Sequence, residues 1–170
     1  MGALALPMGA PIPAEWPLPE LKIPGQEIAA WVAQRGLTEE KHPIVTLSPG
    51  AVGAGKAWPA RHYAELARAL TADGVSVWVL GGPNETLIAK EIVATGGNRV
   101  RDLTGADLRN AILALAAAHV AVTNDSGLMH VSAAIGTPTI AIFGPTSPWH
   151  WKPLNPLAAV FEPPGDEHVR

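Results

Sequence analysis

The alternation of apolar runs with amphipathic segments constrains the fold of this chain more than any other feature of its sequence. Six apolar runs are typical of buried strands: 43–48, 75–80, 99–103, 119–124, 138–144 and 158–162. Four segments between them have the apolar spacing of helices: 59–74, 84–94, 107–118 and 126–135. Strands that alternate with helices take right-handed crossovers and form a parallel sheet covered on both faces. The sequence therefore predicts an α/β fold with a doubly wound, Rossmann-like parallel sheet.

The two ends of the chain differ in composition from this alternating part. Residues 1–24 hold six prolines, which remove backbone donors and favour extended structure. We therefore expect a linker over residues 1–24, one domain over residues 25–165 that begins with a short helix at 27–34, and a tail over residues 166–170. The apolar start has no basic residue and is interrupted by prolines, unlike a secretory signal. No apolar run approaches the ~20 residues that span a bilayer.

Composition excludes several classes of function. The net charge of −3 supplies no basic field for nucleic acid or anionic lipid, so recognition of a phosphate has to be local. The chain has no cysteine, which excludes disulfides and thiolate metal sites and suits a reducing compartment such as the cytosol. His119 and His130 lie far apart in the sequence with no acidic cluster beside them, so we predict no metal site.

The first loop at the carboxyl edge of the predicted sheet, where doubly wound folds bind ligands, is SPGAVGAGKAWP at 48–59. Residues 50–56 match the letters of a phosphate-binding P-loop that ends in Lys56. A P-loop needs Ser or Thr after the lysine, and the lysine at the start of a helix. Here Ala57 follows the lysine, and Trp58 and Pro59 intervene at the helix start, so Lys56 stays in the loop. These departures disfavour a nucleotide triphosphatase. Lys56 is then either a solvated loop residue or a point charge for a phosphate.

The second loop, LGGPNETL at 80–87, combines glycines with an acidic residue. Gly81 and Gly82 allow a ligand to approach the backbone closely, and Asn84 is a candidate N-cap for the following helix. Glu85 would then lie in the first helical turn. There it either interacts with the helix dipole or accepts two hydroxyls of a ribose, and the residues alone leave both roles open.

The stretch VTNDSGLMH at 122–130 sets polar residues between a strand and a helix. The first amides of that helix, from Gly127 to Met129, lack intrahelical partners, and with the positive helix end they predict an anion site. Asp125 would repel a phosphate, so it either caps the helix or accepts hydrogen bonds from sugar hydroxyls. His130, one turn into the helix, is a packed or capping residue or a catalytic one.

Four stretches carry a resemblance to a known family: GKAWPARHYAELARAL, GGPNE, DLTG and VTNDSGLMHVSAAIGTPTIAIFGPTSP. In this order they resemble the carboxyl-terminal half of the heptosyltransferases of glycosyltransferase family 9, most of all those of the ADP-heptose:lipopolysaccharide heptosyltransferase II type. The likeness runs from Ile44 to Pro148, and NDSGLMH followed by GPTSP is its most specific part. It implies a two-domain GT-B fold in which the second domain holds the nucleotide-sugar donor.

The resemblance also implies roles for individual residues. Lys56 would contact the phosphate of the donor, Glu85 would hold the ribose, and Asp125 would meet the heptose hydroxyls. The phosphate-binding helix start would comprise Ser126, Gly127, Leu128 and Met129. His130 would lie near the diphosphate, and the loop 103–107 would lie beside the adenine.

By the same resemblance, the chain is the donor half of an inverting heptosyltransferase that adds heptose to the lipopolysaccharide inner core. The amino-terminal domain that binds the acceptor and supplies the general base is absent from this sequence. We therefore expect no catalytic residue in the chain, and binding of ADP-heptose or ADP without sugar transfer. The expected location is the bacterial cytoplasm, including the cytoplasmic face of the inner membrane. Assistance by magnesium stays open, as do a stand-alone nucleotide-binding module and a P-loop-like NTPase.

Overall fold

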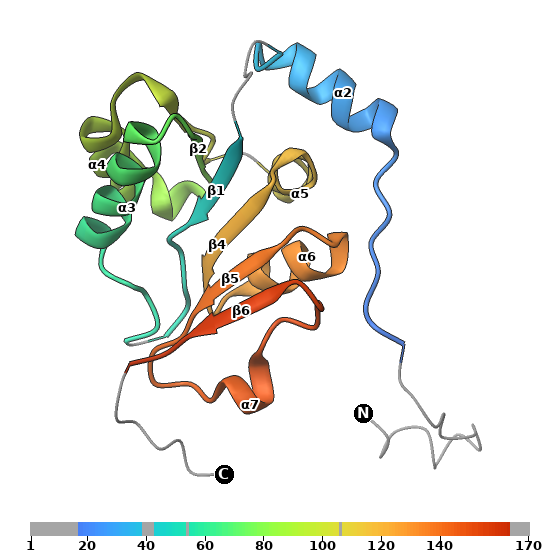
Figure 1. The fold of residues 1–170 in the computed structure, drawn as a ribbon, viewed down its shortest axis with the longest axis vertical. Helices are drawn as coiled ribbons and strands as arrows, with labels where there is room; N and C mark the ends of the chain where they lie inside the picture. The colour runs from blue at the N-terminus through green and yellow to red at the C-terminus, as the bar shows by residue number, and fades with distance from the viewer. Residues whose placement is uncertain (1–16, 39–42, 54, 106, 164–170) are drawn as a thin grey trace.

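One sheet of six parallel strands organises the computed structural model, which describes residues 17–38, 43–53, 55–105 and 107–163. The strand order is β3-β2-β1-β4-β5-β6 (Figure 1). The strands are β1 (Ile44–Ser48), β2 (Ser76–Val79), β3 (Val100–Asp102), β4 (Val120–Asn124), β5 (Thr139–Ile142) and β6 (Ala158–Phe161). Each lies within a range predicted from the sequence. The predicted α/β class with a doubly wound parallel sheet is confirmed.

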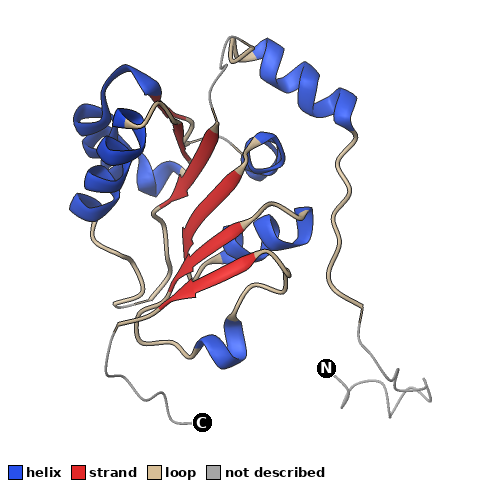
Figure 2. Cartoon of the chain, viewed as in Figure 1, coloured by secondary structure: helices blue, strands red, loops and turns tan. Residues whose placement is uncertain are grey.

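Helices connect the strands, as Figure 2 shows. They are α2 (Gly25–Gln34), α3 (Ala60–Ala72), α4 (Thr86–Gly96), α5 (Leu108–Ala117), α6 (Gly127–Ile135) and α7 (Pro148–Trp151), with 3-10 turns η2 (Pro83–Glu85) and η3 (Gly97–Arg99). All the predicted helices are present, whereas α7 and the two 3-10 turns were not predicted. Asn84 is not the N-cap of α4, contrary to prediction. The 3-10 turn that begins at Pro83 delays the helix, so that Glu85 becomes its N-cap.

The sheet separates the two larger hydrophobic cores of the described residues, because side chains of a strand alternate between its faces. Val45 and Leu47 of β1 pack in the core under α3 and α4. Ile44 of the same strand and Trp78 of β2 pack in the opposite core, with residues of α2 and α5. The continuous apolar runs of the sequence therefore supply core side chains to both faces of a buried parallel sheet.

The two halves of the sheet carry their helices on opposite faces. The chain runs from β1 outward to β3, then returns to β4 and runs outward to β6. Right-handed crossovers in these two directions place α3 and α4 on one face and α5 and α6 on the other (Figure 1). On the α3 side of β4, β5 and β6 lies an open apolar groove of about 790 Å³, whose lining includes Val120, Ile140 and Phe161.

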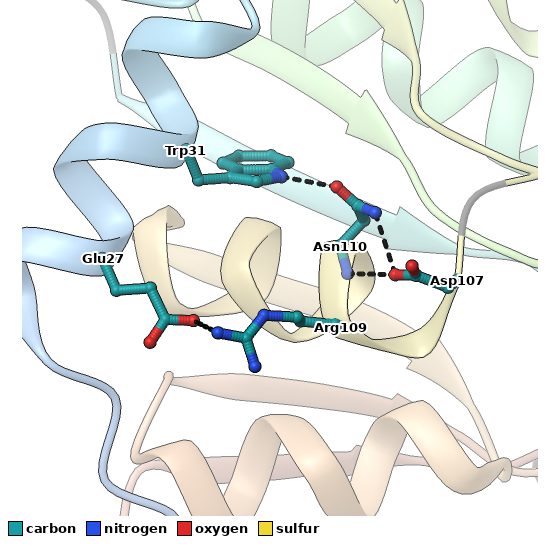
Figure 3. Close-up of polar contacts among 5 residues, drawn as sticks. All are labelled: Glu27, Trp31, Asp107, Arg109 and Asn110. Atoms are coloured by element: carbon teal, nitrogen blue, oxygen red, sulfur yellow. Dashed lines mark hydrogen bonds and ion pairs between the residues drawn. The ribbon is translucent and has the colours of Figure 1, made fainter.

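Helix α2 is docked on α5 by a small polar network (Figure 3). The indole N–H of Trp31 donates to Oδ1 of Asn110 at 2.7 Å, and Glu27 pairs with Arg109. Asp107 is the N-cap of α5, because its Oδ1 accepts the backbone N–H of Asn110 at 2.9 Å and the side-chain Nδ2 at 2.8 Å. These hydrogen bonds hold the pKa of Asp107 below its usual value. The network fixes where α5 begins.

The apolar spacing of Leu108, Ile112 and Leu115 predicts that all three side chains of this helix point inward, but Leu108 does not face the core. Its side chain is 60% exposed, whereas the buried residues of α5 are Leu113, Ala114 and Leu115. Because Asp107 caps the helix one residue earlier, Leu108 lies in the first turn. There it lines the cavity described below.

Residues 17–24 form neither helix nor strand. They lie beside α6, where the backbone N–H of Leu21 donates to the carbonyl of Ala134 at 2.7 Å. The rest of the predicted linker and the predicted tail 166–170 lie outside the described residues.

Candidate functional site

A cavity of about 620 Å³ lies at the carboxyl ends of β1, β2 and β4, the edge where the sequence predicted a ligand. Of the eight predicted donor-binding residues, seven line it: Lys56, Glu85, Asp125, Ser126, Gly127, Leu128 and His130. Residues distant in the sequence meet here because parallel strands end at one edge of the sheet.

Lys56 and Asp125 form an ion pair at the wall of this cavity. Nζ of Lys56 lies 2.7 Å from Oδ2 of Asp125, and the hydroxyl of Thr146 donates to the same oxygen at 2.7 Å. The side chain of Asp125 is only 7% exposed, and that of Lys56 is 26% exposed. A carboxylate this buried requires a charged or hydrogen-bonding partner, and here it has both. Lys56 lies in the loop ahead of α3, which begins at Ala60, and not at a helix start as a P-loop lysine would.

Asn124 holds the loop that carries Lys56. This residue is fully buried at the end of β4. Its Oδ1 accepts the backbone N–H of Trp58 at 3.1 Å and the hydroxyl of Tyr63 at 2.9 Å, while its Nδ2 donates to the carbonyl of Pro49 at 2.7 Å. Burial raises the pKa of Tyr63, which keeps the phenol protonated as a donor. One amide side chain thereby ties both ends of the loop to the sheet.

Glu85 lies between the first and second loops. Its Oε2 accepts the backbone N–H of Gly82 at 2.7 Å. A Cβ on Gly81 would come within 2.6 Å of the Glu85 Cβ, and a Cβ on Gly50 within 2.9 Å of its carboxyl carbon. The glycines at these positions leave room for the glutamate side chain. The sequence alone instead predicts that the glycines of the second loop allow the close approach of a ligand.

The start of α6 is open, as the sequence predicted. Ser126 is the N-cap residue, and no side-chain hydrogen bond caps the helix. Gly127 is exposed, with nothing within 4 Å of where a Cβ would lie. Of the two alternatives left open for Asp125, the capping role is wrong, because its carboxylate contacts Lys56 and Thr146 and no helix amide.

Met129 does not belong to this open helix start. Its backbone N–H, predicted to be unpartnered, donates to the carbonyl of Ser126 at 3.2 Å. Its side chain is fully buried in a core with Ala141 and Phe143. The first turn is tight, so this amide bonds to the carbonyl three residues earlier. The amides of Gly127 and Leu128 are therefore the ones left at the open start of the helix.

Two hydroxyls at the cavity are buried without a protein partner. Oγ of Ser48, at the end of β1, and Oγ of Ser126 are inaccessible to solvent and have no hydrogen-bond partner among the described residues. Both residues line the cavity. A buried polar atom left unpaired costs about 1–3 kcal/mol, so each of these two hydroxyls lowers the stability of the fold.

Among the residues of the cavity wall, sequence reasoning missed Leu108 and Trp151 and left the role of His130 open. Leu108 and Trp151 line the cavity, and both are more than half exposed. Trp151 belongs to α7, which the sequence did not predict. His130, which the sequence left as packed, capping or catalytic, is exposed and lines the cavity, so the packed alternative is wrong.

The loop 103–107 lies against the second loop, where the backbone N–H of Gly105 donates to the carbonyl of Gly81 at 3.1 Å. Its described residues do not line the cavity, whereas Leu108 immediately after it does. Among the described residues no group of three or more His, Asp or Glu side chains is arranged to hold a metal ion. In the same part of the chain, no helix combines the length and apolar character needed to cross a membrane.

Comparison with known proteins identifies the family of this fold and site. The profile of glycosyltransferase family 9 (heptosyltransferase) matches residues 3–167. The chain belongs to glycosyltransferase family 9. Lipopolysaccharide heptosyltransferase 2 of Salmonella typhimurium and that of Escherichia coli are each 36% identical to it over 165 residues, which is 94% of this chain and 47% of each relative. This family 9 chain therefore spans about half the length of the curated relatives it matches.

Solved structures of family members agree with this assignment. The structure of E. coli ADP-heptose LPS heptosyltransferase II superposes with a TM-score of 0.82 at 36% identity, covering 88% of this chain and 47% of that one. E. coli heptosyltransferase WaaC with ADP superposes with a TM-score of 0.73 at 25% identity, covering 95% and 48%. The doubly wound sheet of this family 9 chain corresponds to half of a GT-B heptosyltransferase.

Proposed function

We propose that this family 9 chain is the donor-binding half of an inverting heptosyltransferase and that its cavity holds ADP-heptose. One observation carries the proposal: a lysine ammonium group and an uncapped helix start line the same cavity as a carboxylate held between two glycine loops. The relatives support the choice of ligand, because one solved structure contains ADP and another is an ADP-heptose enzyme.

The diphosphate would lie against the start of α6. The amides of Gly127 and Leu128 supply N–H donors at the positive end of the helix, and the absence of a side chain at Gly127 allows a phosphate to come close. Lys56 supplies the point charge, since an ammonium group has three donors and Asp125 occupies one.

The nucleoside would occupy the side of the cavity formed by the second loop. Glu85 accepts only the N–H of Gly82 in this loop, and a carboxylate has capacity to accept the two hydroxyls of a ribose as well. The exposed side chain of Leu108 offers an apolar wall to the adenine, beside the loop 103–107.

The heptose would occupy the side of the cavity that Asp125, His130 and Trp151 border. Oδ2 of Asp125 is taken by Lys56 and Thr146, which leaves Oδ1 for sugar hydroxyls. Asp125 thus accepts hydrogen bonds from the sugar, while its paired lysine contacts the diphosphate. This division avoids a contact between carboxylate and phosphate, which would be repulsive.

The reaction would be a single displacement with inversion. An acceptor hydroxyl oxygen bonds to the anomeric carbon while the bond from that carbon to the diphosphate breaks, and the acceptor proton passes to a general base outside this chain. Negative charge develops on the departing ADP. Lys56 and the amides of α6 are positioned to stabilise that charge, and one donor of this kind is worth about 3 kcal/mol in the transition state of a related charge-stabilising site.

The acceptor follows from the relatives that are named lipopolysaccharide heptosyltransferase 2. We propose the lipopolysaccharide inner core as acceptor and the cytoplasmic face of the bacterial inner membrane as the place of reaction. Because this chain matches about half of each relative, it would bind donor without transferring sugar until a second half supplies the acceptor site.

Calorimetric titration of the 170-residue chain with ADP, ADP-heptose, UDP and GDP tests the proposal. ADP and ADP-heptose should bind at one site per chain, with UDP and GDP about tenfold weaker or more because they lack the adenine. Equal binding of all nucleotides would remove ADP-heptose as the donor. Hydrolysis of ATP with release of phosphate would instead favour the rival P-loop-like NTPase, which the position of Lys56 ahead of α3 disfavours.

A further inference from the structure

Thr146 shares one oxygen of Asp125 with Lys56. Its Oγ1 donates to Oδ2 at 2.7 Å, and Nζ of Lys56 contacts that same Oδ2 at 2.7 Å. The backbone N–H of Asp125 donates to the carbonyl of Ile142 at 3.2 Å, which ties the residue to the end of β5. Among the described residues no donor contacts the other oxygen, Oδ1. The carboxylate is therefore held from one side and open on the other.

The loop after β5 brings Thr146 to this position by lying directly against the loop that carries Lys56. A Cβ on Gly144 would collide with the backbone carbonyl oxygen of Gly55. A Cβ on Gly55 would lie 3.6 Å from the ring of Pro145, three residues after Ile142, which accepts the backbone N–H of Asp125. The glycine at position 144 thus permits the close contact of two loops that meet over one carboxylate.

Lys56, Asp125 and Thr146 differ in charge, so a bound diphosphate affects the hydrogen bond of Thr146 differently from the ion pair of Lys56. A bound diphosphate attracts Lys56 and repels Asp125, so it weakens the ion pair that holds the carboxylate. A hydroxyl carries no net charge and has no comparable reason to leave Oδ2 for the phosphate. The Thr146 hydrogen bond should therefore persist when a bound phosphate weakens the ion pair.

We propose that Thr146 is a positioning residue for donor binding. It holds Asp125 so that Oδ1 faces the sugar while Lys56 contacts the diphosphate. The inference rests on the proposed function, because it needs a nucleotide sugar in the cavity. It goes further in assigning a role to a residue that does not itself line that cavity.

Replacement of Thr146 by Val keeps the shape of the side chain and removes the hydroxyl. Calorimetry on the 170-residue chain should show ADP-heptose binding weakened by about tenfold, because the carboxylate that meets the sugar loses a hydrogen bond that orients it. ADP, which has no heptose, should bind with an affinity within about threefold of the wild-type value. Thr146→Ser restores the hydroxyl and should recover ADP-heptose binding. Thr146→Ala is a second variant in case the valine disturbs the loop.

Matched controls separate positioning from general stability. Thr95→Val removes another threonine hydroxyl, which donates to the carbonyl of Glu91 on α4, and should leave both affinities unchanged. In an Asp125→Asn background, Thr146→Val should have no further effect on the preference for ADP-heptose over ADP. Thermal unfolding of each variant reports whether the fold is retained.

Two results would overturn the role of Thr146 while leaving the proposed function intact. These are an equal loss of ADP and ADP-heptose affinity, which is what a merely structural role predicts, and no loss of either. If the wild-type chain binds neither ADP nor ADP-heptose, the proposed function is overturned, and the inference with it.

Discussion

The ammonium group of Lys56 lies 2.7 Å from Oδ2 of Asp125, a residue 69 positions further along the chain. This pair joins the first loop of the sheet to the start of α6. It balances the charge of a carboxylate that is 7% exposed and places a cation at the helix end where anions bind.

Replacement of Lys56 by Ala should weaken ADP binding by about tenfold or more, because the phosphate loses a charged donor. The same change leaves Asp125 with only Thr146, so we expect a loss of about 1–3 kcal/mol in the free energy of unfolding while the fold is retained. Calorimetry and urea unfolding measure the two effects. Lys90→Ala, an exposed lysine on α4, is the matched control. Unchanged ADP affinity in Lys56→Ala would exclude the phosphate role.

Replacement of Asn124 by Ala should reduce both stability and affinity. The change leaves the N–H of Trp58, the hydroxyl of Tyr63 and the carbonyl of Pro49 without their partner, at a cost of about 2–4 kcal/mol. ADP affinity should fall because the loop with Lys56 is no longer tied to β4.

The matched control for Asn124→Ala is Asn155→Ala, which removes a comparable bond to the carbonyl of Thr137. It should lower stability without changing ADP affinity. A similar drop in affinity for both variants would contradict a specific role of Asn124 in holding the loop.

A pair of neighbouring glycines tests the position of Glu85. In Gly81→Ala the new Cβ meets the Glu85 side chain at 2.6 Å and must displace it, whereas in Gly82→Ala the nearest atom, Oε2 of Glu85, is at 3.4 Å. We expect Gly81→Ala to weaken ADP binding by about tenfold through loss of the ribose contact, and Gly82→Ala by clearly less. Equal affinities of the two variants, measured by calorimetry, would argue against Glu85 as a ribose ligand.

The two tryptophans of α7 provide a further comparison. Trp151 lines the cavity, while Trp149 is 78% exposed and does not line it. Trp151→Ala should weaken ADP-heptose binding by about threefold to tenfold, in keeping with the loss of one aromatic wall. Trp149→Ala should change it little. Quenching of intrinsic fluorescence by the ligand in the Trp149→Ala variant, and its loss in Trp151→Ala, checks which indole is near the donor.

Local and periodic features of the sequence were enough for the fold. The apolar run that includes Leu47 needs burial on both faces, and such runs alternating with helices leave few topologies other than a parallel sheet. The open start of α6 was also predictable, because Gly127 follows a polar turn after a strand. Leu108 was placed on the wrong side because its orientation depends on the cap at Asp107 and not on apolar spacing.

Contacts between distant loops could not be predicted. The hydrogen bond from Thr146 to Asp125 requires that Gly144 let one loop approach another, and no spacing in the sequence encodes that approach. The three bonds of Asn124 depend in the same way on the tertiary fold. The sequence offered one signal for these contacts, a glycine beside a polar turn. Such a glycine is equally compatible with the approach of a ligand and with the approach of another loop.

Amide chemical shifts during an ADP titration of the isotopically labelled chain test the central claim most directly, namely that the start of α6 and Lys56 together hold a diphosphate. The account predicts that the largest shifts occur at Gly127 and Leu128, and that they shrink in Lys56→Ala. Largest shifts along the apolar groove around Ile140 and Phe161, or no saturable shift at the start of α6, would contradict it.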